Sequence, residues 1–148
     1  MHRLIASWFG SGLLLGAVRG SDRGSGTVGA ALALVFSLAF GVIGWWVQAL
    51  AAVVVAVAAV WSAGHFAEDG DPGWVVVDEA AGMFLATIGL LGWSALVAFF
   101  VFRIADIFKR TPGVGAAESL PGGWGITADD LVAGLYGLAA GWAFQLMT

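Results

Sequence analysis

The longest gap between charged side chains sets the first limit on the fold. Residues 24–67 contain no Asp, Glu, Lys or Arg, a stretch of 44 positions. One helical crossing of a bilayer takes about 20 residues, so this stretch is too long for a single span. Its middle reads GVIGWWVQAL, and paired tryptophans followed by Gln48 are typical of a turn at a membrane interface. The stretch therefore predicts a helical hairpin, with arms at about 28–43 and 47–63.

The composition indicates an integral membrane protein. The chain is 60% hydrophobic and 11% charged, whereas a soluble domain has roughly 45–50% apolar and 25% charged residues. A length of 148 residues suits one domain, predicted to span 1–148. The expected fold class is an all-α, polytopic membrane bundle with short hairpin helices and a charged site on its cytoplasmic face.

Several classes of chemistry are excluded by what the sequence lacks. There is no cysteine, so disulfides, thiolate nucleophiles and Cys-ligated zinc are absent. No basic patch with interleaved aromatic residues points to nucleic acid. The segment MHRLIASWFGSGLLLGAVRG is similar to a signal peptide but lacks a clear small-x-small cleavage site. Its Gly-Ser-Gly at 10–12 equally suits a break between two helices.

The apolar run at 80–102 allows two topologies. As one straight span, it would place Asp78 and Asp106 about 42 Å apart, at 1.5 Å per residue, on opposite membrane faces. Gly89 and Gly92 weaken a helix in the middle of the run, and the following tryptophan suits an interface. The alternative is a second, shorter hairpin at about 80–88 and 95–108, whose arms need shielding by other helices.

The positions of the charges favour the second hairpin. It brings all six Lys and Arg residues and all ten Asp and Glu residues to one side of the membrane. Basic residues mark the cytoplasmic side, so the charged face is predicted to lie there. Residues 109–127 are rich in glycine and proline and are predicted to form a loop on this face. Thr127, followed three residues later by Asp130, is predicted to cap a last helix over 131–147.

Acidic residues recur where apolar runs meet this face. Carboxylate oxygens are the ligands of hard divalent ions, most simply Mg²⁺, which keeps several waters and bridges to phosphate. Each acid alone is better explained as a helix cap that interacts with the helix dipole. Because three separate segments deliver them to one face, the metal-site interpretation is preferred. The predicted metal ligands and catalytic acids are Asp78, Glu79, Asp106, Asp129 and Asp130.

Basic and glycine-rich segments near these acids suggest phosphate binding. Arg103 and Asp106 share a helical face, either as a salt bridge or with the arginine on a phosphate and the aspartate facing metal. Lys109 is the second candidate cation. Among the glycine-rich segments, GSGTVG at 24–29 is the best candidate for a phosphate cradle, through Gly26 and Thr27. A structural turn is the better explanation of this segment taken alone.

Familiar phosphatase devices do not fit. There is no Cys-x5-Arg motif, and two histidines are too few for a multi-histidine lipid phosphatase. His65 is expected to be interfacial rather than catalytic. The Asp-x-Asp spacing at 69–71 is not preceded by an apolar strand. Phosphate chemistry in this chain therefore has to use metal and acids.

Five motifs, in order, resemble those of phosphatidylglycerophosphatase A, a bacterial membrane enzyme. They are FGSGL at 9–13, GTVGA at 26–30, DPGWVVVDEAAGM at 71–83, FRIADIFK at 102–109 and GGWGITADDLVAG at 122–134. The acids and cations above fall on the family's polar motif positions. Two features differ from the family. The usual Lys-Pro-x-Pro is replaced by KRTP, with Arg110 after the lysine, and a longer link without proline follows the first glycine motif.

The resemblance implies a function. Family members convert phosphatidylglycerophosphate to phosphatidylglycerol with magnesium, so the expected substrate is a phospholipid and the expected location is the bacterial inner membrane, with the site facing the cytoplasm. In that scheme Mg²⁺ polarises the phosphomonoester and activates water, while Arg103 and Lys109 stabilise the developing charge. Two alternatives remain, a phosphatase for another lipid phosphate and a non-catalytic, ion-binding transporter or scaffold. No oligomeric state is predicted.

Overall fold

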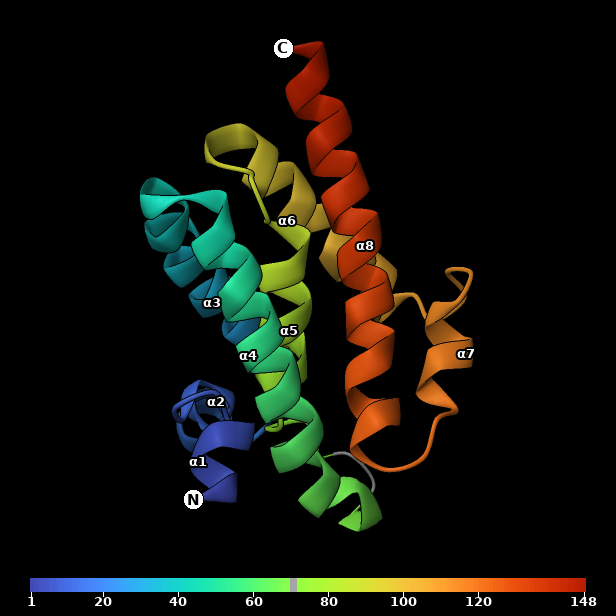
Figure 1. The fold of residues 1–148 in the computed structure, drawn as a ribbon. Coiled ribbons are helices and arrows are strands. Elements are labelled where there is room, and N and C mark those ends of the chain that lie inside the picture. The colour runs from blue at the N-terminus through green and yellow to red at the C-terminus, as the bar shows by residue number, and fades with distance from the viewer. Residues whose placement is uncertain (70–71) are drawn as a thin grey trace.

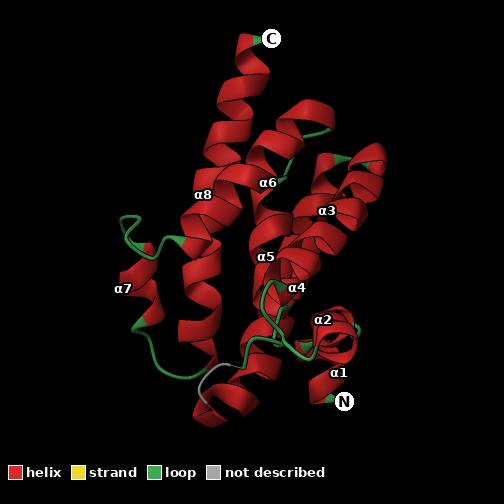
Figure 2. Cartoon of the chain, turned by 180° about the vertical axis from the view of Figure 1, so that it is seen from behind, coloured by secondary structure: helices red, strands yellow, loops and turns green. Residues whose placement is uncertain are grey.

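The computed structural model describes residues 1–69 and 72–148. Within these ranges the chain forms helices joined by turns, with no strand (Figure 2). The prediction of an all-α fold is therefore confirmed. The elements are α1 (His2–Ala6), α2 (Ser11–Arg19), α3 (Ser25–Ile43), α4 (Trp45–Ala63), the 3-10 helix η1 (Gly64–Asp69), α5 (Val77–Ala86), α6 (Gly92–Ile107), α7 (Val114–Glu118) and α8 (Gly123–Met147).

The first predicted hairpin is present. Helices α3 and α4 are separated only by Gly44, and both exceed their predicted lengths by two or three residues at the N-terminal end. Trp45 and Trp46 at the turn are exposed, as an interfacial turn requires. The segments Ser25–Ile43 and Trp45–Glu68 are each long and apolar enough to cross a membrane.

The second apolar run also folds as a hairpin rather than as one straight helix. Helix α5 ends at Ala86, a turn containing Gly89 at φ 75° follows, and α6 begins at Gly92 with φ 56°. Left-handed φ values are accessible to glycine at no steric cost, which explains the reversal here. This turn, the α3–α4 turn and the C terminus lie at one end of the bundle (Figure 1). Helix α6 therefore returns toward the end where α5 begins.

Gln48 holds the tip of the second hairpin. Its side chain is 1% exposed, so the prediction that it belongs to an interfacial turn is wrong. Its Nε2 donates to the Ser37 carbonyl at 3.1 Å and the Leu90 carbonyl at 3.4 Å, and its Oε1 accepts from the Gly89 N–H at 2.8 Å. The amide therefore satisfies backbone groups that the α5–α6 turn leaves outside any helix.

Replacing Gln48 with Leu is expected to destabilise the fold by about 2–4 kcal/mol. The change leaves the buried Gly89 N–H and Leu90 carbonyl without their partner, and each unsatisfied group costs about 1–3 kcal/mol. Thermal unfolding of the purified protein in detergent measures the effect. Gln145→Leu, at an exposed position of α8, is the matched control and should leave Tm within a degree or two. Equal Tm values for the two variants would contradict this role.

Helix α5 is the centre of the bundle. Most of its residues are buried, and α3, α4 and α8 pack around it (Figure 1). Its closest approach is to α8, where a Cβ on Gly82 would lie 2.6 Å from the Asp130 carbonyl oxygen and a Cβ on Gly134 would lie 2.6 Å from the Gly82 carbonyl oxygen. Small residues thus permit the close helix packing expected from the glycine content.

The amino-terminal segment breaks into two helices. Residues 7–10 separate α1 from α2, in agreement with the predicted break near 10–12. The Ala6 carbonyl accepts a hydrogen bond from the Val76 N–H at 2.8 Å, so α1 is fastened to the residues just before α5. The segment is therefore part of the folded domain.

The prediction for residues 109–127 was partly wrong. This segment contains the short helix α7, and α8 begins at Gly123, four residues before Thr127. Gly122 is the N-cap of α8, with φ 60° and no side-chain cap. Thr127 lies inside the helix and is fully buried, so it does not form the predicted Thr-x-x-Asp cap. Gly122 supplies the positive φ before the helix, and Gly123 and Gly125 let it start earlier because the chain fits closely there against α4 and the end of α7.

Candidate active site

The predicted acids meet in one cavity. It has a volume of about 240 Å³ and lies where α5 begins, α6 ends and α8 makes its second turn. Asp78 and Asp106, which a single straight span would have separated by the thickness of a membrane, both line it. The full lining is Pro72, Gly73, Val75, Asp78, Glu79, Arg103, Asp106, Ile107, Lys109, Ile126, Asp129 and Asp130. We call this space the acid cavity.

Three of the acids form its inner group. One carboxylate oxygen each from Asp78, Glu79 and Asp130 lies within 4.8 Å of the others. Asp78 and Asp130 are each 4% exposed. Glu79 Oε2 and Asp130 Oδ1 are buried and have no hydrogen-bond partner among the described residues. Buried carboxylate oxygens are costly to leave without compensation, so this group is suited to hold a cation.

The other two acids pair with the two cations. Asp106 Oδ2 lies 2.5 Å from Arg103 Nη1, one helical turn away on α6, and Glu79 Oε1 lies 4.0 Å from the same nitrogen. The salt-bridge alternative for Arg103 and Asp106 is thus present in the structure. The guanidinium also borders the inner acid group, and its Nε is buried without a hydrogen-bond partner in the described chain.

Lys109 joins the end of α6 to two other helices. Its ammonium donates a hydrogen bond to Asp129 Oδ2 on α8, and Glu118 Oε1 on α7 lies 3.3 Å away. Burial acts to lower the pKa of Lys109, but the hydrogen bond and negative charge of Asp129, together with Glu118, outweigh it and raise the pKa above its ordinary value. Sequence reasoning missed Glu118, although it is the only acid between Lys109 and Asp129.

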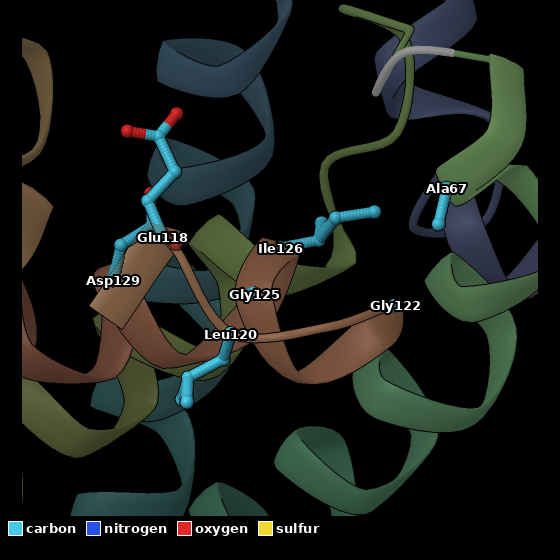
Figure 3. A pocket seen from close by; sticks show the side chains of 7 residues that line it. All are labelled: Ala67, Glu118, Leu120, Gly122, Gly125, Ile126 and Asp129. Atoms are coloured by element: carbon cyan, nitrogen blue, oxygen red, sulfur yellow. The ribbon is translucent and has the colours of Figure 1, made fainter. Parts of the chain in front are cut away.

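A second cavity adjoins the first. It measures about 230 Å³ and shares Ile126 and Asp129 with the acid cavity. In Figure 3, Glu118 and Asp129 stand at one side of it and Ala67 at the other, with the glycines of the α8 start between them. The space therefore continues from the acid cavity toward the end of α4.

The glycine-rich segment at 24–29 forms the start of α3 and reaches the site at Gly26. A Cβ on Gly26 would lie 1.9 Å from Glu79 Oε1 and 3.2 Å from an Nη of Arg103, so the α3 backbone packs directly against the inner acid group. Thr27 is exposed in the first turn of α3, whose N-cap is Gly24. Of the two predicted phosphate-cradle residues, the structure therefore brings Gly26 to the acids.

The histidines lie elsewhere. The rings of His2 and His65 stack with centroids 3.6 Å apart, and His65 Nδ1 lies 2.9 Å from the Trp61 carbonyl oxygen. Neither histidine lines the acid cavity. The Asp-x-Asp spacing at 69–71 falls largely outside the described residues, because 70 and 71 are not among them.

Comparison with known proteins identifies the family. The family model described as phosphatidylglycerophosphatase A matches residues 4–145. The chain belongs to this family. Phosphatidylglycerophosphatase A proteins are phosphatases, so the chain is an enzyme of that class. This agrees with the resemblance carried by the five motifs.

Two relatives carry the family name, and a third carries another. Proteins of that name from Escherichia coli K12 and Haemophilus influenzae are 32% identical over 138 residues and 41% identical over 78 residues. The matches cover 89% and 51% of this chain, and 76% and 48% of those proteins. A Bacteroides thetaiotaomicron protein, provisionally named phosphatidylinositol-3-phosphatase, is 36% identical over 90% of this chain and 86% of its own length. No solved structure matches the chain.

Proposed function

We propose that the chain is a single-domain, magnesium-dependent phosphatase that hydrolyses the phosphomonoester of phosphatidylglycerophosphate to phosphatidylglycerol and phosphate. The observation that carries this proposal is the acid cavity, in which five carboxylates and two cations from three helices meet in a chain of this family. The reaction belongs to the biosynthesis of phosphatidylglycerol and of the lipids made from it.

The acid cavity fits a magnesium ion. Magnesium prefers oxygen ligands and is usually held by one or two carboxylates, with waters and substrate phosphate filling the other positions. Asp78, Glu79 and Asp130 would hold it, because their oxygens converge and two of those oxygens are buried without partners. When bound, the ion supplies positive charge at the phosphoryl group and makes water a better nucleophile.

The remaining polar residues position the phosphate. Arg103, held by Asp106, has a buried Nε free to donate to a phosphoryl oxygen, and its fork geometry suits that role. Lys109, held by Asp129, places a second positive charge in the lining of the cavity. These fixed donors stabilise the negative charge that builds up on the phosphoryl oxygens during transfer. A carboxylate of the same group acts as general base.

The proposed location is a bacterial inner membrane, with the acid cavity facing the cytoplasm. Helices α3 and α4 are suitable spans, and their outer surfaces expose large apolar side chains such as Val35, Val53 and Val57. The α5–α6 hairpin enters the bilayer from the charged end and turns back inside the bundle, where Gln48 satisfies its tip. The lipid tails of the substrate then stay in the bilayer while the headgroup reaches the acids.

A second lipid substrate has support from one relative. The Bacteroides thetaiotaomicron protein is provisionally named for a 3-phosphoinositide, which also carries a phosphomonoester on a lipid headgroup. The acids and cations of the acid cavity act on the phosphate group, so a different headgroup is compatible with the same chemistry. The family consists of phosphatases, so we set aside the transporter or scaffold alternative.

Phosphate release by the purified protein from a panel of lipids tests the proposal. Phosphatidylglycerophosphate should give the highest kcat/KM, ahead of phosphatidylinositol 3-phosphate and phosphatidic acid. Chelation with EDTA should reduce the rate by more than about a hundredfold, because the buried acids then lack the charge that the metal supplies, and added Mg²⁺ should restore it. A higher kcat/KM for the phosphoinositide would show that phosphatidylglycerophosphate is not the preferred substrate. Full activity in EDTA would show that the reaction does not need a metal ion.

A further inference from the structure

The amino-terminal segment carries a charge opposite to that of the rest of the chain. Residues 1–23, which we call the amino-terminal hairpin, contain three arginines and one aspartate, whereas residues 24–148 contain three basic and nine acidic side chains. Arg3, Arg19 and Arg23 are all exposed. Five of the nine acids line the acid cavity, whereas the proposed chemistry uses none of these arginines.

The axis of α2 runs in a different direction from the long helices of the bundle. Helix α2 is viewed almost along its axis in both Figure 1 and Figure 2, whereas α4 and α8 run up the picture. Helix α2 therefore lies across the long helices, at the end of the bundle where α5 begins (Figure 1). In a membrane with α3 and α4 as spans, it lies close to the plane of the bilayer surface.

The hairpin also exposes apolar side chains beside its arginines. Leu14 and Val18, one helical turn apart on α2, are 54% and 79% exposed, and Phe9 in the preceding turn is exposed as well. A helix with exposed apolar residues and flanking arginines is typical of segments that lie in the interface, with the apolar side in the acyl region and the cations at the headgroups.

The hairpin is attached directly to the acid cavity. The Val76 N–H donates to Ala6 at the end of α1, and Asp78 follows two residues later. At its other end, Arg23 precedes Gly26, which packs against Glu79. A cavity of about 490 Å³ borders the hairpin on this side and is lined by Arg3, glycines of α2, Asp22 and Trp74. A lipid headgroup gathered by the hairpin is therefore next to the site.

We infer that the amino-terminal hairpin is a docking surface for anionic phospholipid headgroups, which it gathers beside an otherwise acidic site. Charge complementarity carries the inference, because the acidic remainder of the chain repels an anionic lipid surface while the three arginines attract it. A basic residue near an anionic bilayer surface strengthens binding about fivefold. The effect on turnover rests on the proposed function, whereas the lipid binding rests only on the membrane location.

Thermal unfolding of the full chain in neutral detergent tests the inference without measuring activity. Phosphatidylserine, an anionic lipid without a phosphomonoester, should raise Tm more than phosphatidylcholine does, because a ligand that binds the folded state stabilises it. The variant Arg19→Gln with Arg23→Gln should lose this difference, and added salt should weaken it in the wild type. Arg110→Gln, at an exposed arginine beyond α6, is the matched control and should keep it. Arg19→Lys with Arg23→Lys should also keep it.

Turnover provides the second readout. In mixed micelles the double glutamine variant should show a KM for the lipid phosphate raised by about tenfold or more, with kcat within twofold of the wild type. The inference would be overturned if the double glutamine variant kept the phosphatidylserine effect on Tm, or if the lysine variant lost it. If the wild type shows this effect on Tm but releases phosphate from no lipid, the proposed function is contradicted and the docking surface is not.

Discussion

Replacing Asp130 with Asn is expected to reduce phosphate release more than a hundredfold while the protein stays folded. The side chain belongs to the inner acid group and is 4% exposed. The substitution therefore removes one negative charge from the proposed metal site. Loss of a partner that only orients a ligand typically costs about 10–100-fold in metal affinity or activity, and loss of a ligand should cost more. The measurement is kcat/KM on phosphatidylglycerophosphate over a range of Mg²⁺ concentrations.

Stability should move in the opposite direction from activity. Without metal, Asp130 is a buried carboxylate close to Asp78 and Glu79, and Asn removes one of these like charges with almost no change of shape. The metal-free variant should therefore have a Tm equal to or above that of the wild type, and Mg²⁺ should no longer raise it. Glu68→Gln, at an exposed acid of η1, is the control and should keep both activity and the Mg²⁺ response. Wild-type turnover in Asp130→Asn would remove this residue from the metal site.

The course of the helices could be predicted because it depends on properties that are local in the sequence. An uncharged stretch interrupted at Gly44 has few alternatives to a hairpin once it exceeds the length of one span. The reversal at Gly89 was predicted from two weak local signals and from one global condition, that the ionised side chains share a face. The structure supports that condition by bringing Asp78 and Asp106 into one cavity.

The roles of individual polar residues could not be predicted in the same way. Gln48 near two tryptophans has the local pattern of an interfacial residue, but it is buried because the tip of another hairpin packs against α4. Thr127 has the pattern of a helix cap, but glycines upstream let α8 begin earlier. Asp106 had two interpretations at a spacing of three residues, and the structure shows the salt bridge with Arg103. The burial of Gln48 depends on a neighbour distant in the chain, which a local sequence pattern does not show.

Gly26→Ala is expected to damage the site while leaving the fold nearly intact. Nothing in the backbone conformation requires glycine there, because the residue lies within the first turn of α3. The added Cβ would lie 1.9 Å from Glu79 Oε1, so the carboxylate has to swing away from the inner acid group. We expect a loss of about 10–100-fold in kcat/KM and in Mg²⁺ affinity, the scale found when a ligand is displaced from its position. Tm should change little, since the clash involves the end of a flexible side chain.

Two further variants separate this steric effect from any general effect of alanine. Gly64→Ala, at the start of η1, has its nearest neighbouring atom 3.4 Å from the new Cβ, an ordinary contact, and should leave kcat/KM unchanged. Glu79→Asp shortens the obstructed side chain by one methylene. The double variant Gly26→Ala with Glu79→Asp should therefore lose less kcat/KM than the product of the two single losses. Strictly multiplicative losses would show that the two residues act independently. Gly26 would then contribute through its backbone N–H, as a phosphate cradle, rather than by leaving room for the acid.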